Sequence, residues 1–207
     1  MNTSAALLLI DLQNDFLKDG ALAVPDGNAT IPIALQLMER FEHIVATQDW
    51  HPPKHQSFAS QHADHSLFEI IDLHGLPQCL WPDHCVQGSK GAEFAAGISL
   101  EKIDKIVQKG TDETIDSYSG FADNGHRKET DLHEYLQSKN IETLYIMGLA
   151  TDYCVKFTVL DALKKNYNVY LVVDGCRGVN QSPRDSENAI REMEQAGAEL
   201  IASVDVL

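Results

Sequence analysis

Runs of consecutive apolar residues alternate along this chain with segments of helical periodicity. Residues 5–10 (AALLLI), 144–147 (LYIM) and 169–173 (VYLVV) contain no regular polar position, which is typical of strands buried on both faces of a parallel sheet. Between such runs, apolar residues recur at helical spacing, most clearly over residues 155–165. This alternation restricts the chain to folds in which helices cover a central sheet.

The whole pattern predicts a three-layer α/β/α sandwich with a mostly parallel, Rossmann-like central sheet, formed as a single domain over residues 1–207. The further strands are expected at 43–49, 105–108 and 199–202, and the other helices at 31–41, 132–137 and 182–195. Residues from about 50 to 100 do not follow this alternation of strands and helices, and they are rich in His, Pro and Gly. A loop of that length inside a compact domain is usually functional, so we expect it to insert into the metal and substrate sites.

Composition and charge exclude several classes of partner. The net charge of -15 and the pI near 4.8 argue against nucleic acid or an anionic membrane surface. The apolar run at 5–10 is too short for a signal peptide or a membrane span. Without an export signal, the cysteines are expected to be reduced thiols in the cytoplasm. No role can be derived for three of them, Cys79, Cys85 and Cys176.

The turn after residues 144–147 contains a potential nucleophile. Gly148 breaks the strand, and Thr151 is expected to be the N-cap of the next helix, which would place Cys154 in the first helical turn. Unpaired N–H groups and the helix dipole at that position would favour a reactive thiolate. The alternative is a small buried cysteine that only packs the turn.

Two further reactive residues follow predicted strands. Asp11 comes directly after the strand 5–10, and Lys109 closes the strand 105–108. Ligands of parallel α/β sheets bind beyond the carboxyl ends of the strands, so these side chains are expected near Cys154. There Asp11 could accept the thiol proton, Lys109 could stabilise both anions, and Cys154 could attack. Taken singly, Asp11 could be only a turn residue and Lys109 only a solvated charge.

A possible metal site follows the second predicted strand. Asp49 and His51 lie on the same side of an extended segment, and His84 in the proline-stiffened segment WPDHC is the expected third ligand. Two histidines and one carboxylate leave open positions and suit Zn²⁺ in the first place, or Fe²⁺ or Mn²⁺. The alternative is a solvated strand end. We expect three other histidines of this loop, His55, His62 and His65, to face mostly solvent.

Six sequence blocks occur in a characteristic order along the chain. They are LLLIDLQNDF (7–16), TQDWHP (47–52), WPDHCVQG (81–88), QKGTD (108–112), YSGF (118–121) and GLATDYCV (148–155). In content and order these blocks resemble those of the nicotinamidases, a family of isochorismatase-like cysteine hydrolases, over essentially the full length. The resemblance implies the fold and the chemistry of that family.

The resemblance also implies a role for each matching residue. The implied set comprises a catalytic triad of Asp11, Lys109 and Cys154; metal ligands Asp49, His51 and His84; and aromatic walls around a pyridine ring at Phe16, Trp81 and Tyr118. Ser57 matches a position that supplies a further ligand in some relatives, but serine is a weak ligand, so we expect it beside the metal rather than on it. The backbone N–H groups of Ala150 and Cys154 would form the oxyanion hole, next to a cis peptide between Leu149 and Ala150.

The implied reaction is hydrolysis of nicotinamide to nicotinate and ammonia through a thioester on Cys154, as in NAD salvage. One divalent metal ion would hold the substrate, and pyrazinamide would be a second substrate. No nucleic acid or membrane partner is expected, and a homo-oligomer is not excluded. The sequence leaves open the metal bound in the cell, the oligomeric state and the range of amides.

Two other functions compete with this one. Another hydrolase of the same fold could act on isochorismate or on a carbamoyl or ureido group. Cys154 argues against the isochorismate reaction, which needs no cysteine, and the ligand set argues against carbamoyl and ureido hydrolases, which are not expected to carry it. A non-enzymatic metal-binding or redox-sensing protein would explain the histidines and Cys154, but it would give no reason for Asp11 and Lys109 at strand ends.

Overall fold

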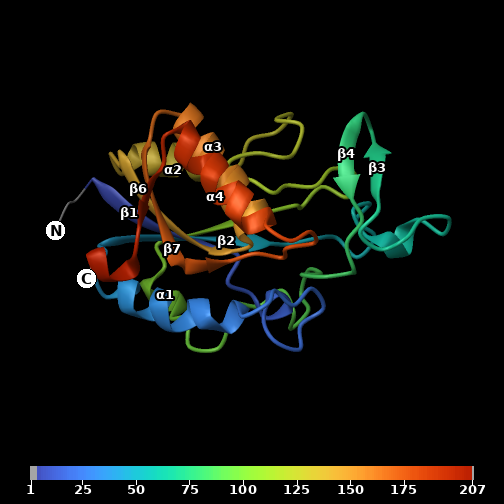
Figure 1. The fold of residues 1–207 in the computed structure, drawn as a ribbon, viewed down its shortest axis with the longest axis horizontal. Helices are drawn as coiled ribbons and strands as arrows, with labels where there is room; N and C mark the ends of the chain where they lie inside the picture. Colours follow the sequence, from blue (N-terminus) through green and yellow to red (C-terminus); the bar gives the residue numbers. More distant parts are fainter. Residues whose placement is uncertain (1–3, 207) are drawn as a thin grey trace.

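The computed structural model of this protein describes residues 4–206, and its centre is a six-stranded sheet (Figure 1). The strands lie in the order β5-β2-β1-β6-β7-β8, and every neighbouring pair is parallel. Their bounds are β1 Ala5–Ile10, β2 His43–Asp49, β5 Lys105–Lys109, β6 Thr143–Leu149, β7 Asn168–Arg177 and β8 Glu199–Ile201. The predicted α/β fold with a parallel central sheet is confirmed.

Strand β1 forms the core of the sheet. All six of its residues are buried, because β2 and β6 flank it on both edges and helices cover both faces. The chain therefore needs apolar residues at every position of β1, which explains the uninterrupted run AALLLI. β6 and the first half of β7 follow the same rule with few exceptions.

Helices form the two outer layers. Helix α1 (Thr30–Met38) covers one face of the sheet, whereas α2 (Leu132–Ser138), α3 (Lys156–Lys164) and α4 (Asp185–Ala196) lie on the other (Figure 1). The chain leaves β1 toward one edge and later returns through β6 toward the opposite edge, so the direction of winding reverses between these two strands. In open α/β sheets the ligand site lies at this reversal, beyond the carboxyl ends of the strands.

The predicted helices and strands occur with small shifts of their ends. Helix α1 ends at Met38 rather than near Phe41, and the Phe41 ring packs on Tyr145 with a centroid distance of 5.0 Å. Helix α4 begins at Asp185 and ends where Gly197 adopts a φ of 115°, the stop that the sequence predicts.

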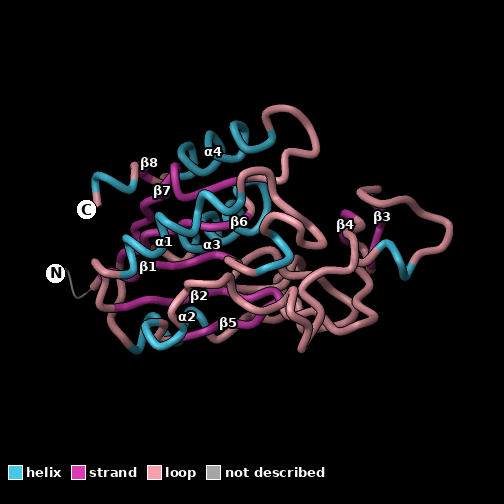
Figure 2. Tube along the Cα trace, turned by 90° about the horizontal axis from the view of Figure 1, so that it is seen from below, coloured by secondary structure: helices cyan, strands magenta, loops and turns pink. Residues whose placement is uncertain are grey.

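The segment 50–100 contains regular structure that the sequence pattern did not predict. Strands β3 (Ile70–Leu73) and β4 (Leu76–Cys79) form an antiparallel hairpin that projects beyond the end of the main sheet (Figures 1 and 2). Its two-residue turn, His74-Gly75, has φ values of 54° and 84°. Two positive φ angles in a tight hairpin turn strongly favour glycine, so Gly75 was the available signal. Within residues 4–206, no helix is long and apolar enough to cross a membrane.

Candidate active site

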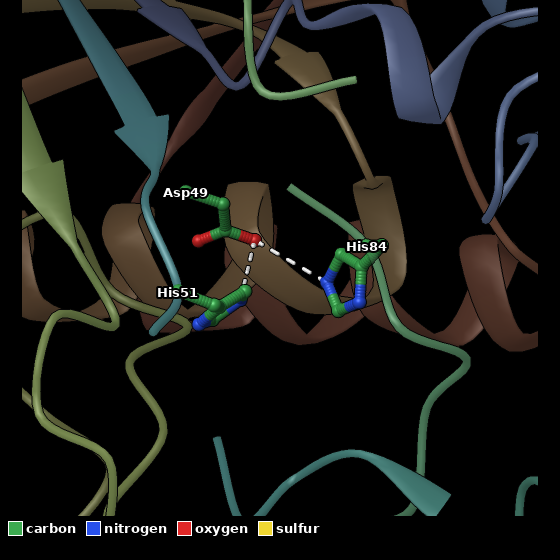
Figure 3. Close-up of side chains that lie close together, drawn as sticks. All are labelled: Asp49, His51 and His84. Carbon is green, nitrogen blue, oxygen red and sulfur yellow. Dashed lines mark ion pairs between the residues drawn. The ribbon is translucent and has the colours of Figure 1, made fainter. Parts of the chain in front are cut away.

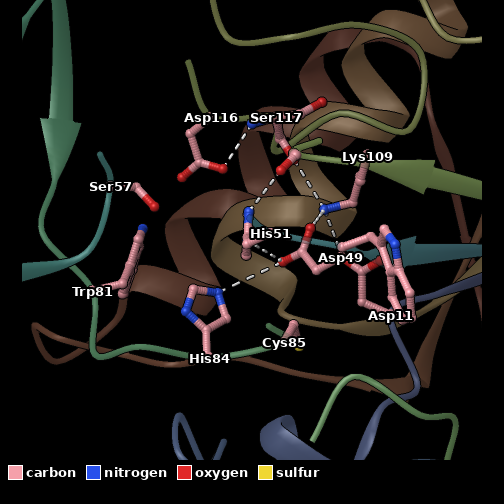
Figure 4. A network of polar contacts seen from close by, with 12 residues as sticks. Asp11, Asp49, His51, Ser57, Trp81, His84, Cys85, Lys109, Asp116 and Ser117 are labelled. Atoms are coloured by element: carbon pink, nitrogen blue, oxygen red, sulfur yellow. Dashed lines mark hydrogen bonds and ion pairs between the residues drawn. The ribbon is translucent and has the colours of Figure 1, made fainter. Parts of the chain in front are cut away.

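The ends of four parallel strands bring the predicted reactive residues together. Asp11 follows β1, Asp49 ends β2, Lys109 ends β5, and Cys154 lies in the turn after β6. Figure 4 shows this network from close by, with the Asp49, Lys109 and Asp11 side chains pointing toward one another. The sheet topology therefore brings together, at one point, residues as far apart in the sequence as Asp11 and Cys154.

Lys109 is the centre of the polar network. Its Nζ lies 2.9 Å from Asp11 Oδ2 and 3.3 Å from Cys154 Sγ, and it donates to the carbonyl oxygen of Ser117 at 3.0 Å and to Asp49 Oδ1. The side chain is fully buried, and burial alone would lower the pKa of this amine. Asp11 and Asp49 outweigh that effect and raise the pKa of Lys109 well above its usual range, so Lys109 is a buried cation.

Asp11 is held by the neighbouring strand. Thr47 Oγ1 donates to Asp11 Oδ1 at 2.6 Å and accepts from the Asp11 N–H at 3.1 Å. The other carboxylate oxygen, Oδ2, forms the ion pair with Lys109 but accepts no hydrogen bond from the described residues. Burial raises the pKa of Asp11, and nearby Asp49 raises it further against the effect of Lys109. Asp11 therefore offers one oxygen that can take up a proton.

The local structure around Cys154 differs from the prediction. Residues Thr151–Val155 form a π-helical turn before α3, and its N-cap is Ala150 rather than the predicted Thr151. The N–H groups of Tyr153 and Val155 both donate to Ala150 O, so the expected row of unpaired donors around the thiol is partly used. The peptide between Leu149 and Ala150 is cis, as the resemblance implied.

The expected thiolate-favouring environment of Cys154 is also wrong. Burial raises the pKa of the Cys154 thiol well above its usual value, and the negative charges of Asp11 and Asp49 add to this effect. Lys109 lowers the pKa but does not compensate. Cys154 is therefore a neutral thiol in the free protein and needs a proton acceptor before it can act as a nucleophile.

The three predicted metal ligands converge next to this network (Figure 3). Asp49 Oδ2 lies 3.5 Å from His51 Nε2 and 3.7 Å from His84 Nε2. The Nδ1 atoms of the imidazoles lie 2.9 Å from Gly110 O and 2.8 Å from Pro82 O. A carbonyl oxygen only accepts, so each Nδ1 carries a proton and each Nε2 offers a lone pair.

The donor set fits a divalent metal ion. His51 Nε2 is buried and has no hydrogen-bond partner among the described residues, which is costly for a polar atom unless another group binds there. Two imidazole nitrogens and one carboxylate oxygen within 4.8 Å of one another form a group that could hold such an ion.

The prediction that His55 faces solvent is wrong. This residue is fully buried, its ring centroid lies 4.4 Å from that of His51, and burial lowers its pKa to about 4. Its Nδ1 lies 2.7 Å from Ser57 Oγ, so the Ser57 hydroxyl is engaged by His55 beside the ligand group. His62 is partly exposed and His65 is exposed, as expected.

Next to the thiol and the ligand group is a narrow, partly open and mostly apolar pocket with a cavity volume of about 20 Å³. The predicted aromatic walls Phe16, Trp81 and Tyr118 all line it. Trp81 Nε1 donates to the Tyr118 hydroxyl at 3.1 Å, which fixes the two rings at an interplanar angle of 85°. Its lining combines aromatic and aliphatic side chains with a few polar groups, among them Asp49, His84 and Cys154, which is typical of pockets that bind small molecules.

Several residues at this cavity were not predicted. Tyr153 packs on Trp81 with a centroid distance of 4.8 Å, and Asp116 contributes a buried carboxylate that accepts from Gln78 Nε2 at 3.0 Å. Leu22 and Val179 complete the apolar lining. Tyr153 precedes the nucleophile candidate directly, and Asp116 lies two residues before Tyr118, so proximity to the recognised blocks was the available signal.

Comparison with known proteins agrees with this arrangement. The isochorismatase domain matches residues 5–205. The chain is 51% identical to the nicotinamidase of Escherichia coli K12 over 204 residues, which cover 97% of this chain and 95% of that protein.

Several solved structures have a similar fold. A nicotinamidase/pyrazinamidase of Acinetobacter baumannii superposes with a TM-score of 0.96 at 40% identity, covering 100% of both chains. The yeast nicotinamidase bound to the inhibitor nicotinaldehyde gives 0.91 at 29% identity, covering 96% of this chain and 99% of that one. The pyrazinamidase of Pyrococcus horikoshii in complex with zinc superposes with a TM-score of 0.78 at 36% identity, covering 96% of this chain and 99% of that one. This chain belongs to the isochorismatase domain family.

Proposed function

We propose that this protein is a nicotinamidase, which hydrolyses nicotinamide to nicotinate and ammonia. The observation that carries the proposal is the position of the Cys154 thiol, next to buried Lys109 and at the wall of a pocket lined by aromatic side chains. The relatives named nicotinamidase cover nearly the whole chain at up to 51% identity, which supports the same assignment. Pyrazinamide, a similar ring amide, is the proposed second substrate.

The proposed reaction begins with proton transfer from Cys154 to Asp11. The thiolate then attacks the amide carbon, and Lys109 stabilises both Asp11 and the developing thiolate through its buried charge. The backbone N–H groups of Ala150 and Cys154 are the proposed donors to the oxyanion. When the tetrahedral intermediate collapses, Asp11 returns the proton to the leaving nitrogen, and ammonia departs from a thioester on Cys154.

Hydrolysis of the thioester uses the same acid–base group. Asp11 accepts a proton from water, the hydroxide attacks the thioester carbon, and the C–S bond breaks to release nicotinic acid, which loses its proton to solvent as nicotinate. The proton on Asp11 then returns to the Cys154 sulfur, which restores the resting thiol. The raised pKa of Asp11 supports this exchange, because it makes the carboxylate a stronger proton acceptor.

Asp49, His51 and His84 are the proposed ligands of one divalent metal ion. When bound, such an ion supplies a Lewis-acidic coordination position that can hold the pyridine nitrogen. Zinc is the proposed ion, with iron or manganese as alternatives, and a zinc complex of the P. horikoshii relative supports this choice. Ser57 is proposed to support this group through His55 rather than to bind the ion.

Phe16, Trp81 and Tyr118 are proposed to enclose the pyridine ring, so that the carboxamide faces Cys154. The partner of this protein is then a small neutral amide rather than a macromolecule. We also propose that it acts in the cytoplasm, which is supported by four free cysteines in the described part of the chain.

A substrate panel tests the proposal. Purified protein loaded with Zn²⁺ is assayed for ammonia release from nicotinamide, pyrazinamide and an N-carbamoyl amino acid. We expect turnover of both ring amides and none of the carbamoyl compound. Preferential turnover of the carbamoyl compound would identify a carbamoyl hydrolase of the same fold and would overturn the proposal, as would a protein that hydrolyses none of the three.

A further inference from the structure

Gln13 makes an unusual set of contacts with the proposed metal ligand Asp49. The Gln13 side chain is fully buried, its Oε1 accepts from the Asp49 N–H at 2.8 Å, and its Nε2 donates to Asp49 O at 2.8 Å. The same Nε2 donates to Ala92 O at 2.9 Å. Gln13 thus binds the peptide groups on both sides of one residue and has no role in the reaction proposed above.

The sheet topology explains why a side chain is needed there. The pairing of β1 with β2 ends at Leu9 and Ala46, and β1 leaves the sheet at Asp11, whose φ is 47°. Strand β2 continues to Asp49, where β5 pairs with it on one edge only. On the other edge, the backbone partner that a parallel strand would supply is missing, and the Gln13 amide occupies its place.

Gln13 is itself held firmly. Its backbone forms a bridge with Phe94, while Asn14 N donates to Glu93 O at 3.0 Å and Ala95 N donates to Leu12 O at 2.8 Å. The amide is therefore fixed from the side of the 92–95 segment and presents a rigid donor and acceptor to Asp49. A rigid peptide on both sides of Asp49 fixes the direction of its Cα–Cβ bond, and with it the carboxylate.

We propose that Gln13 is a positioning residue for the metal site, which holds Asp49 in the orientation that the ion requires. This inference rests on the proposed metal ligands. It predicts that loss of the Gln13 amide weakens metal binding, although Gln13 does not contact the ion. Outer partners that orient ligands typically change metal affinity by about 10- to 100-fold when they are replaced.

Gln48 provides a matched control. Its Nε2 donates to the same Ala92 carbonyl at 2.9 Å, and it is nearly as buried as Gln13, but its side chain makes no hydrogen bond to Asp49. Replacement of either glutamine by methionine keeps the volume and removes the amide. Thr47→Val is a second control, because Thr47 holds Asp11 rather than the metal ligands.

The test measures Zn²⁺ affinity by chelator competition and the visible spectrum of the Co²⁺-loaded protein. For Gln13→Met we expect about 10- to 100-fold weaker binding of Zn²⁺ and an altered Co²⁺ spectrum, with Gln48→Met and Thr47→Val close to wild type in both. Wild-type affinity and spectrum in a folded Gln13→Met would overturn the positioning role alone. A wild-type protein that binds no metal would overturn this inference together with the proposed ligand set.

A measurement on the unaltered protein covers the case in which Gln13→Met does not fold. In ¹⁵N-labelled wild-type protein, the side-chain NH₂ protons of Gln13 are expected to exchange slowly with water and to shift when Zn²⁺ is added. Exposed glutamine side chains, such as that of Gln61, should do neither. Rapid exchange of the Gln13 protons, or no shift in a sample that binds Zn²⁺, would contradict the proposal.

Discussion

The Nζ atom of Lys109 lies 3.3 Å from the Sγ atom of Cys154, and both side chains are buried. The charge of Lys109 alone does not produce a thiolate, because burial and two neighbouring carboxylates raise the pKa of Cys154 more than Lys109 lowers it. The Cys154 thiol is therefore neutral, and it lies next to the permanently charged Lys109 ammonium group. Activation of Cys154 therefore requires transfer of the thiol proton to Asp11, which forms an ion pair with the same Lys109.

Lys109→Met should be inactive and less stable. Methionine keeps most of the volume but leaves Asp11 and Asp49 without their buried counter-charge, and breaking a buried ion pair in this way costs about 3–5 kcal/mol. We expect nicotinamide turnover to fall by about 100-fold or more, and urea denaturation to show the loss of stability. A folded variant with wild-type kcat would show that the reaction does not need this cation.

The double variant Lys109→Met with Asp11→Asn separates the two effects. It removes one of the unpaired carboxylates, so part of the lost free energy of unfolding should return. Activity should stay absent, because the proton acceptor is also gone. Recovery of activity in the double variant would contradict the role of Asp11.

Removal of the metal should abolish turnover while leaving the fold intact. The proposed ligands lie beyond the strand ends, whereas the core of the sheet lies around β1, so dialysis against a chelator should leave the far-UV circular dichroism unchanged. Activity should return when Zn²⁺ is added. His84→Ala should behave like the metal-free protein, and His65→Ala, in the exposed part of the loop, should behave like wild type. Full activity of the metal-free protein would exclude a metal role in substrate binding.

Tyr118→Phe should weaken substrate binding more than it slows the chemical steps. The hydroxyl accepts hydrogen bonds from Trp81 Nε1 and Gln78 Nε2, both at 3.1 Å. Its loss leaves Trp81 Nε1 without a partner and frees the Trp81 ring, whereas Gln78 Nε2 still donates to Cys79 O and Asp116 Oδ2. An unsatisfied buried donor costs about 1–3 kcal/mol. We expect KM for nicotinamide to rise several-fold with kcat within about twofold of wild type. The opposite pattern would place Tyr118 in the chemistry.

Asp161 should contribute a pH-dependent part of the stability. Burial raises the pKa of this carboxyl, but hydrogen bonds from His126, Ser119 and Lys164 lower it more, so its folded pKa lies below the ordinary 3.8. Its contribution is then complete above the unfolded pKa and is lost as the pH falls through the folded value. His126 and Lys164 are mostly exposed, so the effect is small, about 1 kcal/mol or less.

Asp161→Asn measures that contribution. The free energy of unfolding should be lower in the variant at pH 6, and the difference from wild type should shrink below pH 4. A difference that stays constant down to pH 3 would mean that the charge of Asp161 is not responsible.

Much of the fold was predictable because its signals are local. The run AALLLI can only be a strand buried on both faces, and Gly197 marks the end of α4 at the predicted residue. The β3–β4 hairpin was missed because its strands are short and half-exposed, which leaves Gly75 as the only clear sign of a turn.

The environment of single side chains could not be predicted in the same way. Strand ends bring Asp11, Lys109 and Cys154 to one edge, but burial of the thiol depends on side chains from distant segments. The sequence therefore predicted a helix N-terminus that favours a thiolate, whereas desolvation and two carboxylates decide the pKa of Cys154. His55 was misplaced for the same reason, because nothing local shows that the loop folds it against His51.

The central claim is that Cys154 is the nucleophile of an amide hydrolase, and ammonia release from nicotinamide by Cys154→Ala tests it most directly. Cys79→Ala is the control, because this buried thiol accepts a hydrogen bond from Gln181 and lies outside the triad. We predict turnover by wild type and Cys79→Ala, and no ammonia above background from folded, Zn²⁺-loaded Cys154→Ala. Turnover by Cys154→Ala at the wild-type rate would contradict the claim.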